Sequence, residues 1–186
     1  MRTSLSKTLP QAILPVLVFI LIVAIFLSIS CKPKRKWATP EPLSQQLFLA
    51  SSLSISDPAS RSQLLSGFHE LEDTWRWTRK DFSVELGRPG TAAQKGARIN
   101  LVFAIPDLVI QKLKSITLYA VINEVKLPSE TYTKPGDYTY SGDLPPAVFT
   151  AEKVKVDFHL DKALPPTATD GRELGIIVSA IGFENK

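Results

Sequence analysis

Cysteine and histidine are scarce in this sequence. Of its 186 residues, one is cysteine (Cys31) and two are histidine (His69 and His159). No cysteine follows residue 31, so neither a disulfide nor a thiolate metal site can stabilise the rest of the chain. Two histidines without metal-ligand spacing give little basis for any other metal centre. The sequence therefore predicts no metal and no cofactor.

Patterns that indicate nucleotide or acyl-transfer chemistry are also missing. The chain has no glycine-rich phosphate loop, no GxGxxG dinucleotide pattern and no serine within a nucleophile elbow. A nucleotide-dependent enzyme is disfavoured on this ground.

Acidic side chains are absent from residues 1–36, which hold six of the 22 basic residues. Residues 37–186 carry the other 16 basic residues and all 18 acidic ones, which leaves a net charge of −2. The overall charge of +4 thus belongs to the amino-terminal segment. A nucleic-acid-binding domain would be expected to carry a basic face of its own, so nucleic acid is disfavoured as a partner.

One long apolar run is present near the amino terminus. Residues 12–29 contain no charged side chain, and Ser30 and Cys31 extend the run to about the 20 residues that a helix needs to cross a bilayer. Nothing polar marks a solvent-facing side, so a buried core helix is disfavoured. The sequence predicts a single-pass transmembrane helix over residues 12–31, preceded by a basic cap at residues 1–11.

Two alternatives to an uncleaved span remain open. Cys31 directly follows the run, as the lipidated cysteine of a bacterial lipoprotein does, although Ser28 stands where an aliphatic residue is usual. A cleaved signal peptide would have a shorter apolar stretch and a small-residue cleavage site. The basic cluster at residues 32–36 attracts anionic membrane lipid. By the positive-inside tendency it slightly favours the cytoplasmic side of a bacterial inner membrane for the domain, whereas a lipoprotein route would allow the opposite side.

Residues 32–60 are interpreted as a linker, basic at first and then rich in proline and serine. Within it, residues 44–56 fit either a short helix or a first strand. Residues 61–186 are long enough to bury a core and are predicted to form one domain. Side chains there alternate between apolar and polar, which is typical of strands with one buried face.

Strands are predicted where this alternation is clearest, at residues 75–78, 82–86, 99–105, 115–125, 138–140, 154–160 and 174–180. Proline and glycine mark turns at residues 87–90 and 134–137, and a helical turn is expected at residues 111–115. About seven or eight short strands predict an all-β fold, an antiparallel and jelly-roll-like β-sandwich.

Two stretches carry a resemblance to a known type of module. Residues 67–78 (GFHELEDTWRWT) end in an aromatic-Arg-Trp-Thr string, and residues 170–178 (DGRELGIIV) show an Asp-x-Arg-x-Leu-Gly pattern. Both resemble the ends of small β-sandwich modules found with bacterial glycosyltransferases and surface-polysaccharide machinery. The resemblance spans about residues 60–184 and implies a β-sandwich that works near envelope polysaccharide. Residues 1–186 contain no glycosyltransferase catalytic domain, and His69 stands where those modules usually have an aromatic residue.

The densest group of titratable side chains consists of His69, Glu70, Glu72 and Asp73. A hydrolase hypothesis takes His69 as general base with Glu72 as its partner, or places two carboxylates across a glycosidic bond. The alternative is structural: Glu72 pairs with Arg76 or Arg172, and His69 lies on a loop.

Aromatic side chains support a binding function. Trp75 and Trp77 have the same parity on a strand, and an aromatic face that is not packed into the core can stack on a sugar ring. The sequence thus predicts a non-catalytic, membrane-anchored domain that binds glycan or a glycosyltransferase partner. A structural adaptor or lipoprotein that binds only protein is the alternative. The candidate ligand-binding residues are Trp75, Trp77, Glu72, Arg76, Asp170, Arg172 and His69.

Full-length protein without a tag should sediment with membranes on ultracentrifugation, because the run at residues 12–29 is buried favourably in hydrocarbon. Protein that stays in the supernatant would contradict the anchor. Labelled palmitate then separates the two kinds of anchor. Label that is incorporated by the natural sequence and lost in Cys31→Ala indicates lipidation, and no incorporation indicates an uncleaved span.

Overall fold

The computed structural model describes residues 49–186, and Leu47–Lys186 forms one compact unit with its own core. The predicted anchor, Cys31 and most of the predicted linker lie outside the described residues. Within residues 49–186 no helix combines the length and apolar character that a membrane crossing requires.

Ten strands make up the described part of the chain, and every pairing between them is antiparallel. The strands are β1 Ser52–Ser54, β2 Leu64–Phe68, β3 Arg76–Gly87, β4 Ala97–Ile105, β5 Ile116–Ile122, β6 Val125–Lys126, β7 Glu130–Tyr132, β8 Gly136–Leu144, β9 Lys153–Leu160 and β10 Ile177–Asn185. The helices are η1 Pro58–Gln63, α2 Ala92–Lys95, α3 Asp107–Leu113 and η2 Pro146–Val148.

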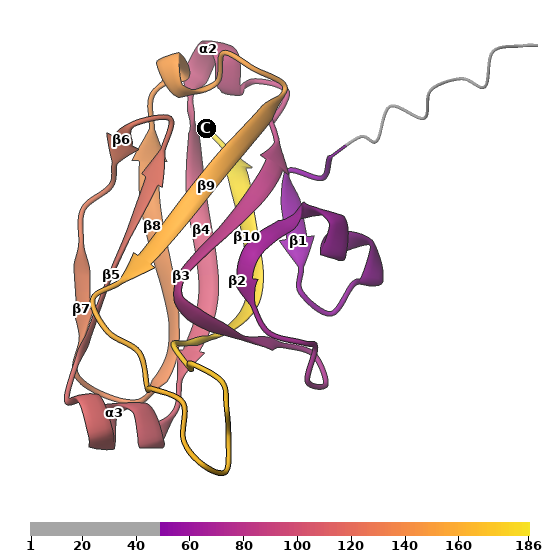
Figure 1. Ribbon diagram of the computed structural model, residues 1–186. Coiled ribbons are helices and arrows are strands. Elements are labelled where there is room, and N and C mark those ends of the chain that lie inside the picture. The colour runs from indigo at the N-terminus through magenta and orange to yellow at the C-terminus, as the bar shows by residue number, and fades with distance from the viewer. Residues whose placement is uncertain (1–48) are drawn as a thin grey trace, which may run out of the picture. The chain divides into compact units, whose positions relative to one another are not determined.

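The strands form a curled sheet whose two halves face each other (Figure 1). One half has the order β1-β10-β4-β8, and the other has the order β2-β3-β9-β5, with β6 and β7 both paired to β5. The halves are joined where the start of β10 pairs with the start of β3, at Ile177–Trp77 and Val178–Arg76. The predicted antiparallel β-sandwich is therefore confirmed, with three strands of only two or three residues adding to the expected number.

The core lies between the two halves and is built by the alternation seen in the sequence. In β4, Ile99, Leu101, Phe103 and Ile105 are buried, while the residues between them are more exposed. In β9, Phe158 is buried and stacks on Phe82 of β3, with ring centroids 5.0 Å apart. Removing such apolar surface from water is the main favourable term in folding.

The described domain begins earlier than the boundary expected after residue 60. Leu53 of β1 and Ile55 are buried in the core, although serines flank both. The buried Gln63 side chain fixes this segment, because it donates to the Ala50 and Glu85 carbonyls and accepts from the Ala50 amide. A three-residue strand is too short for a period-two pattern to reveal it.

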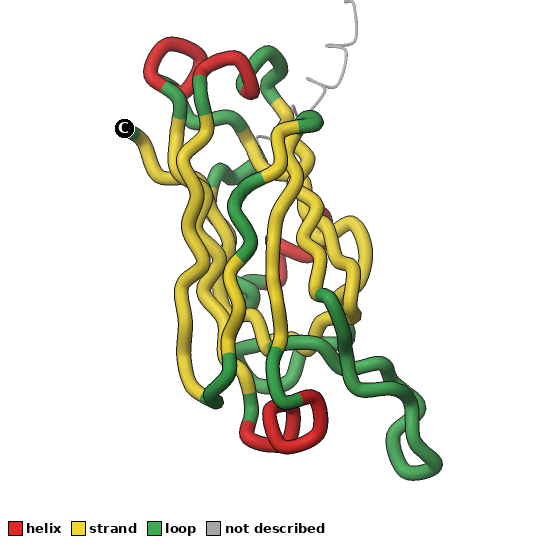
Figure 2. The backbone as a smooth tube through the Cα atoms, turned by 90° about the vertical axis from the view of Figure 1, so that its left-hand side faces the viewer, coloured by secondary structure: helices red, strands yellow, loops and turns green. Residues whose placement is uncertain are grey.

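The helices lie mainly at the ends of the sandwich. Figure 2 shows α2 and α3 at opposite ends of the strands. At the α2 end, the Gly87 amide donates to the Ala50 carbonyl, so the described chain starts here. The α3 end contains the first residues of β3. Since β4 follows α2, precedes α3 and has nine residues, the two ends are roughly 30 Å apart.

Gly96 is expected to tolerate no side chain. It ends α2 with a φ of 77°, and a Cβ placed there would overlap the Leu144 carbonyl oxygen. Gly96→Ala should therefore lower the free energy of unfolding by more than about 2 kcal/mol, measured by urea denaturation. Gly90→Ala is the matched control, because nothing lies within 4 Å of a Cβ at that position. Equal stability of the two variants would contradict this account.

Candidate functional site

A hairpin at residues 69–77 leads into β3 at the α3 end of the sandwich. The amide of each of Glu72 and Trp75 donates to the carbonyl of the other, at 2.9 and 3.1 Å, around a two-residue turn. Asp73 occupies this turn with a φ of 55°, a conformation that aspartate tolerates better than most residues. The turn places the Glu72 and Trp75 backbones side by side.

A loop at residues 165–173 leads into β10 and reaches the hairpin. Leu164 and Leu174 close it by two backbone hydrogen bonds of 2.8 and 3.0 Å. Within the loop, the Asp170 carboxylate accepts from the Arg172 amide at 3.0 Å. Asp170 and Arg172 are thereby held together before their side chains interact.

The Arg172 guanidinium cross-links the loop and the hairpin. Its Nε and Nη2 donate to the Asp170 carboxylate at 3.0 and 2.9 Å, and its Nη1 donates to Glu72 Oε1 at 2.5 Å. Of the two partners that the sequence left open for Glu72, the structure pairs it with Arg172 rather than Arg76. More than a third of each of the three side chains is exposed, so solvent or a ligand can reach the cluster.

Mutual stabilisation shifts the pKa values of this cluster. Hydrogen bonds from the Arg172 side chain, and then from its amide, lower the pKa of Asp170 to about 2. The same bonds to Asp170, followed by the bond to Glu72, raise the pKa of Arg172. Asp170 and Arg172 therefore both stay ionised near neutral pH.

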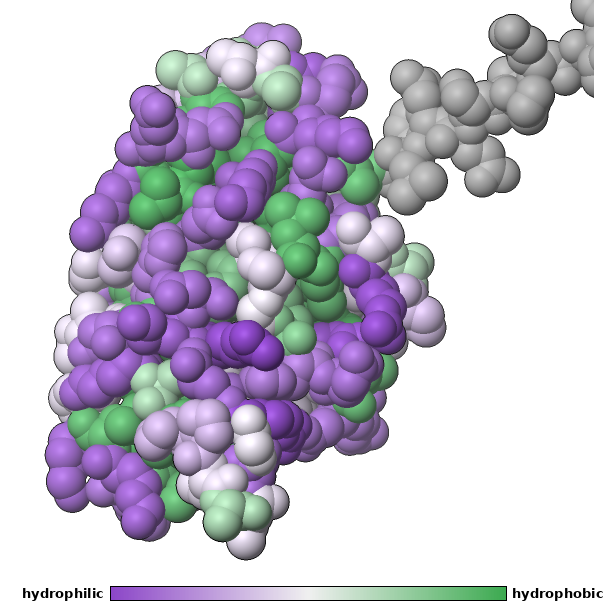
Figure 3. Space-filling model, in the orientation of Figure 1, coloured by the Kyte–Doolittle hydropathy of each residue, from purple (hydrophilic) through white to green (hydrophobic). Residues whose placement is uncertain are grey.

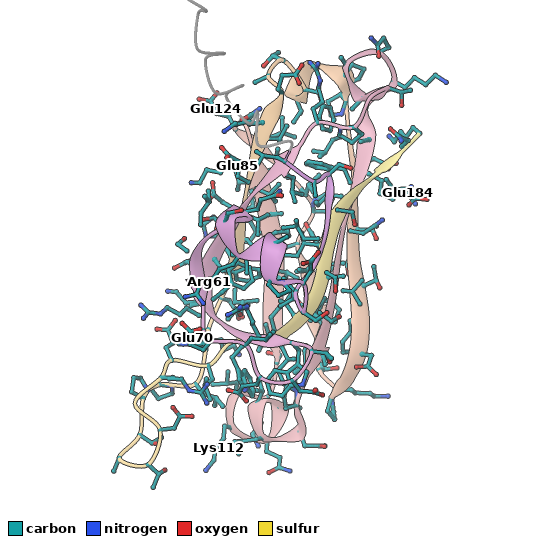
Figure 4. The ribbon with its side chains drawn as sticks, turned by 90° about the vertical axis from the view of Figure 1, so that its right-hand side faces the viewer. Arg61, Glu70, Glu85, Lys112, Glu124 and Glu184 are labelled. Atoms are coloured by element: carbon teal, nitrogen blue, oxygen red, sulfur yellow. The ribbon has the colours of Figure 1, made fainter. Side chains whose placement is uncertain are left out.

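His69 and Arg76 hold the hairpin in place. His69 Nε2 donates to the Glu173 carbonyl at 2.6 Å, and Arg76 Nη1 donates to the His69 carbonyl at 2.8 Å. Arg76 is 8% exposed, and its Nε is buried without a hydrogen-bond partner in the described structure. The Glu70 carboxylate lies 3.9 Å from Arg76 and also pairs with Arg61 on the surface, where Figure 4 shows Arg61 and Glu70 side by side.

The two tryptophans differ in their surroundings. Trp77 packs against the core, and Trp75 is half-buried beside it, with the two rings edge to face at 6.4 Å between centroids. The structure thus brings all seven sequence-predicted residues to the α3 end. Trp75 is the better placed of the two tryptophans to meet a ligand.

A cavity of about 570 Å³ opens between α3 and the loop at residues 165–173. Asp170 and Arg172 line one part of it, and Leu108, Leu113, Leu164 and Leu174 line much of the rest. Lys112, Pro165 and two loop threonines complete the lining, and Figure 4 shows Lys112 at this end of the domain. In Figure 3, hydrophobic side chains reach the surface among hydrophilic ones near α3.

The cavity is the part of the site that the sequence did not predict. Its leucines come from α3 and from both ends of the loop, which are distant in sequence. The helix itself was placed at residues 111–115 and in fact begins at Asp107, directly after Pro106. Proline is common just before or within a first helical turn, so Pro106 was the available signal.

Residues 49–186 contain no group of three or more histidine, cysteine, aspartate or glutamate side chains that could hold a metal ion. His159, the second histidine, lies on the outer face of β9, where its Nδ1 is 2.8 Å from Asp81 Oδ1 and its ring stacks on Tyr119. It is not part of the α3-end site.

No family model matches the sequence, and no curated protein matches it. Among solved structures, a family 36 carbohydrate-binding module in complex with calcium and xylotriose has a TM-score of 0.41 and 12% identity, covering 72% of this chain and 98% of that one. A module of the same family from a multidomain xylanase of the Trinervitermes trinervoides hindgut metagenome scores 0.41 at 8% identity, covering 73% and 98%. A family 35 module from an environmental isolate scores 0.36 at 10% identity, covering 77% and 90%. Likeness at this level establishes neither a family nor a ligand.

Acid titration should reveal the Asp170–Arg172 pair. Because the pKa of Asp170 is lower in the folded chain than its usual value near 4, its contribution to stability is present above pH 4 and is lost as the pH falls towards 2. In thermal unfolding between pH 5 and pH 2, Asp170→Asn should lose less stability than the natural sequence. Asp137→Asn, at an exposed position on β8, should follow the natural sequence. If Asp170→Asn loses as much thermal stability between pH 5 and pH 2 as the natural sequence does, the pairing is contradicted.

Proposed function

We propose that this chain is a non-catalytic, membrane-anchored domain that binds carbohydrate at its α3 end. The observation that carries the proposal is the position of Arg172 on the wall of an open cavity. Its guanidinium is fixed by two carboxylates and still faces solvent. Such a pre-organised group loses little side-chain entropy when a ligand binds.

The hydrogen-bonding capacity left in the cluster suits hydroxyl groups. A guanidinium has five N–H donors, and the bonds from Nε, Nη1 and Nη2 of Arg172 to carboxylates engage three of them. Two donors and the second oxygen of Glu72 thus have no partner among residues 49–186. A sugar carries adjacent hydroxyls that both donate and accept, so it can use these groups together.

Trp75 adds an apolar surface next to these polar groups. It lies opposite Glu72 in the hairpin turn, and Glu72 is bonded to Arg172. An aromatic ring beside fixed polar groups is a suitable arrangement for a sugar, whose faces carry C–H groups and whose edges carry hydroxyls.

The electrostatics of the site favour binding over hydrolysis. A glycosidase needs one carboxylic acid that remains protonated near neutral pH, which requires a raised pKa. The Asp170 pKa is instead lowered by Arg172, and Glu72 is paired with the same cation. His69, the other catalytic candidate, uses its Nε2 to hold the loop.

The place of action is inferred from the sequence. Residues 12–31 would anchor the domain in a bacterial inner membrane, and the resemblance to modules of surface-polysaccharide machinery suggests work in envelope polysaccharide synthesis or export. A glycosyltransferase is the protein partner that this resemblance favours. Genes for glycosyltransferases or export components beside the gene for this chain would support the proposal.

One observation favours a protein-binding adaptor as the second candidate. β8 is the last strand of its half of the sheet, and within the described chain its outer edge has no neighbouring strand. An unpaired edge of nine residues can accept a strand from another protein. The two candidates therefore use different surfaces of the domain.

Titration of residues 47–186 with oligosaccharides released from the envelope should change tryptophan fluorescence, because Trp75 and Trp77 are the only tryptophans in this range. Arg172→Ala should weaken binding at least tenfold, as expected for the loss of hydrogen bonds from a charged group. Arg98→Ala is the matched control, since Arg98 forms a similar bidentate pair with Asp143 on another face. Absence of binding across the fragments, or an equal effect of both variants, would contradict the site.

A further inference from the structure

Apart from three charged residues and two threonines, the lining of the α3-end cavity is aliphatic. Leu108, Leu113, Leu164, Leu174 and Pro165 contribute to it, and none of its lining residues is aromatic. Sugar rings stack on aromatic faces and offer little surface that fills a leucine-lined space. Bound carbohydrate alone therefore leaves most of this cavity unexplained.

The exposure of Leu108 is the observation that most clearly marks the cavity as a binding surface. Leu108 is 50% exposed in the first turn of α3, although the same helix buries Val109 completely. Single exposed leucines are ordinary: Leu65 on β2 is 48% exposed and does not line this cavity. Leu108 differs because three further leucines surround the same open space, and clustered apolar surface with a polar rim is typical of a binding site.

The charged side chains of Asp170 and Arg172 line the same cavity as the leucines, so one ligand can contact both kinds of surface. We propose that the leucine-lined part of the cavity holds the alkyl chain of a glycolipid while Arg172 holds its sugar. This inference rests on the proposed function and names the ligand class more closely. The volume of about 570 Å³ is within the range of small-molecule sites, and the polar wall gives such a ligand one orientation.

The length of the chain before the domain is compatible with a ligand drawn from the membrane. Between Cys31 and Leu49 the sequence has 17 residues, which span up to about 60 Å when extended. This exceeds the roughly 30 Å between the two ends of the sandwich. A domain anchored through residues 12–31 can therefore bring its α3 end back to the lipid surface.

The test is isothermal titration of residues 47–186 with octyl, nonyl and decyl maltoside, each below its micelle-forming concentration. This range is used because it contains the whole compact unit and its core, and because it omits the apolar run that would itself bind detergent. Affinity should rise about fourfold with each added methylene if the chain is buried. Affinity that does not depend on chain length would overturn the inference.

Two variants and a control locate the effect. Leu108→Asp places a charge on the cavity wall, and Thr169→Trp fills the cavity from its exposed loop; both should abolish the dependence on chain length. Leu65→Asp, which changes an equally exposed leucine outside the cavity, should retain it. Unchanged circular dichroism and melting temperature show that the variants are folded. If only Leu65→Asp loses the dependence of affinity on alkyl-chain length, the alkyl chain binds outside this cavity and the inference is overturned.

Comparison with the oligosaccharide titration separates the two proposals. If fragments bind and the maltosides show no dependence on chain length, the carbohydrate function stands and the alkyl site fails. If the dependence is present but fragments do not bind, the alkyl site stands and the carbohydrate function fails. Equal affinity for decyl maltoside and decyl phosphocholine would show that the sugar is not recognised, and would overturn the glycolipid assignment.

Discussion

The pairing of β10 with the first residues of β3 is the constraint on which the site depends. It joins the two halves of the sandwich at Trp77–Ile177, and the buried Thr78 strengthens the junction through its backbone bonds to Gly175 and Ile176. The hairpin precedes β3 and the loop precedes β10, so both leave from this junction. The junction therefore brings the Arg172 guanidinium within hydrogen-bond distance of Glu72, although the two residues are 100 positions apart in sequence.

The sequence predicted the regular parts of this fold well and its irregular parts poorly. Long alternating strands such as β4 and β9 were placed within a residue or two, because a buried face imposes a period of two. The short β1 and the four-residue α2 carry too few residues for any period to emerge. For the site, Glu72 and Arg172 were recognised as charged candidates, but the choice of partner depended on a contact distant in sequence. The leucine-lined cavity was missed for the same reason.

Arg76 shows how the hairpin is held at a cost in stability. A buried guanidinium with an unpaired Nε, and with its nearest carboxylate on the largely exposed Glu70, is not the arrangement that stability alone would favour. Its bond to the His69 carbonyl nevertheless fixes the start of the hairpin, and His69 in turn fixes the loop through Glu173. Local rules are often broken where a binding surface must be held rigid, and Arg76 lies directly beside Trp75 in the chain.

The edge of β8, which has no neighbouring strand among residues 49–186, bears on whether two copies of this domain can pair with each other. If two copies paired antiparallel through this strand in full overlap about Tyr140, Asp137 of each would face Asp143 of the other on the outer face of the sheet. Like charges directly opposite one another destabilise strand pairing. In this register the repulsion weakens pairing between copies, although Arg98 within each copy offsets part of the charge of Asp143.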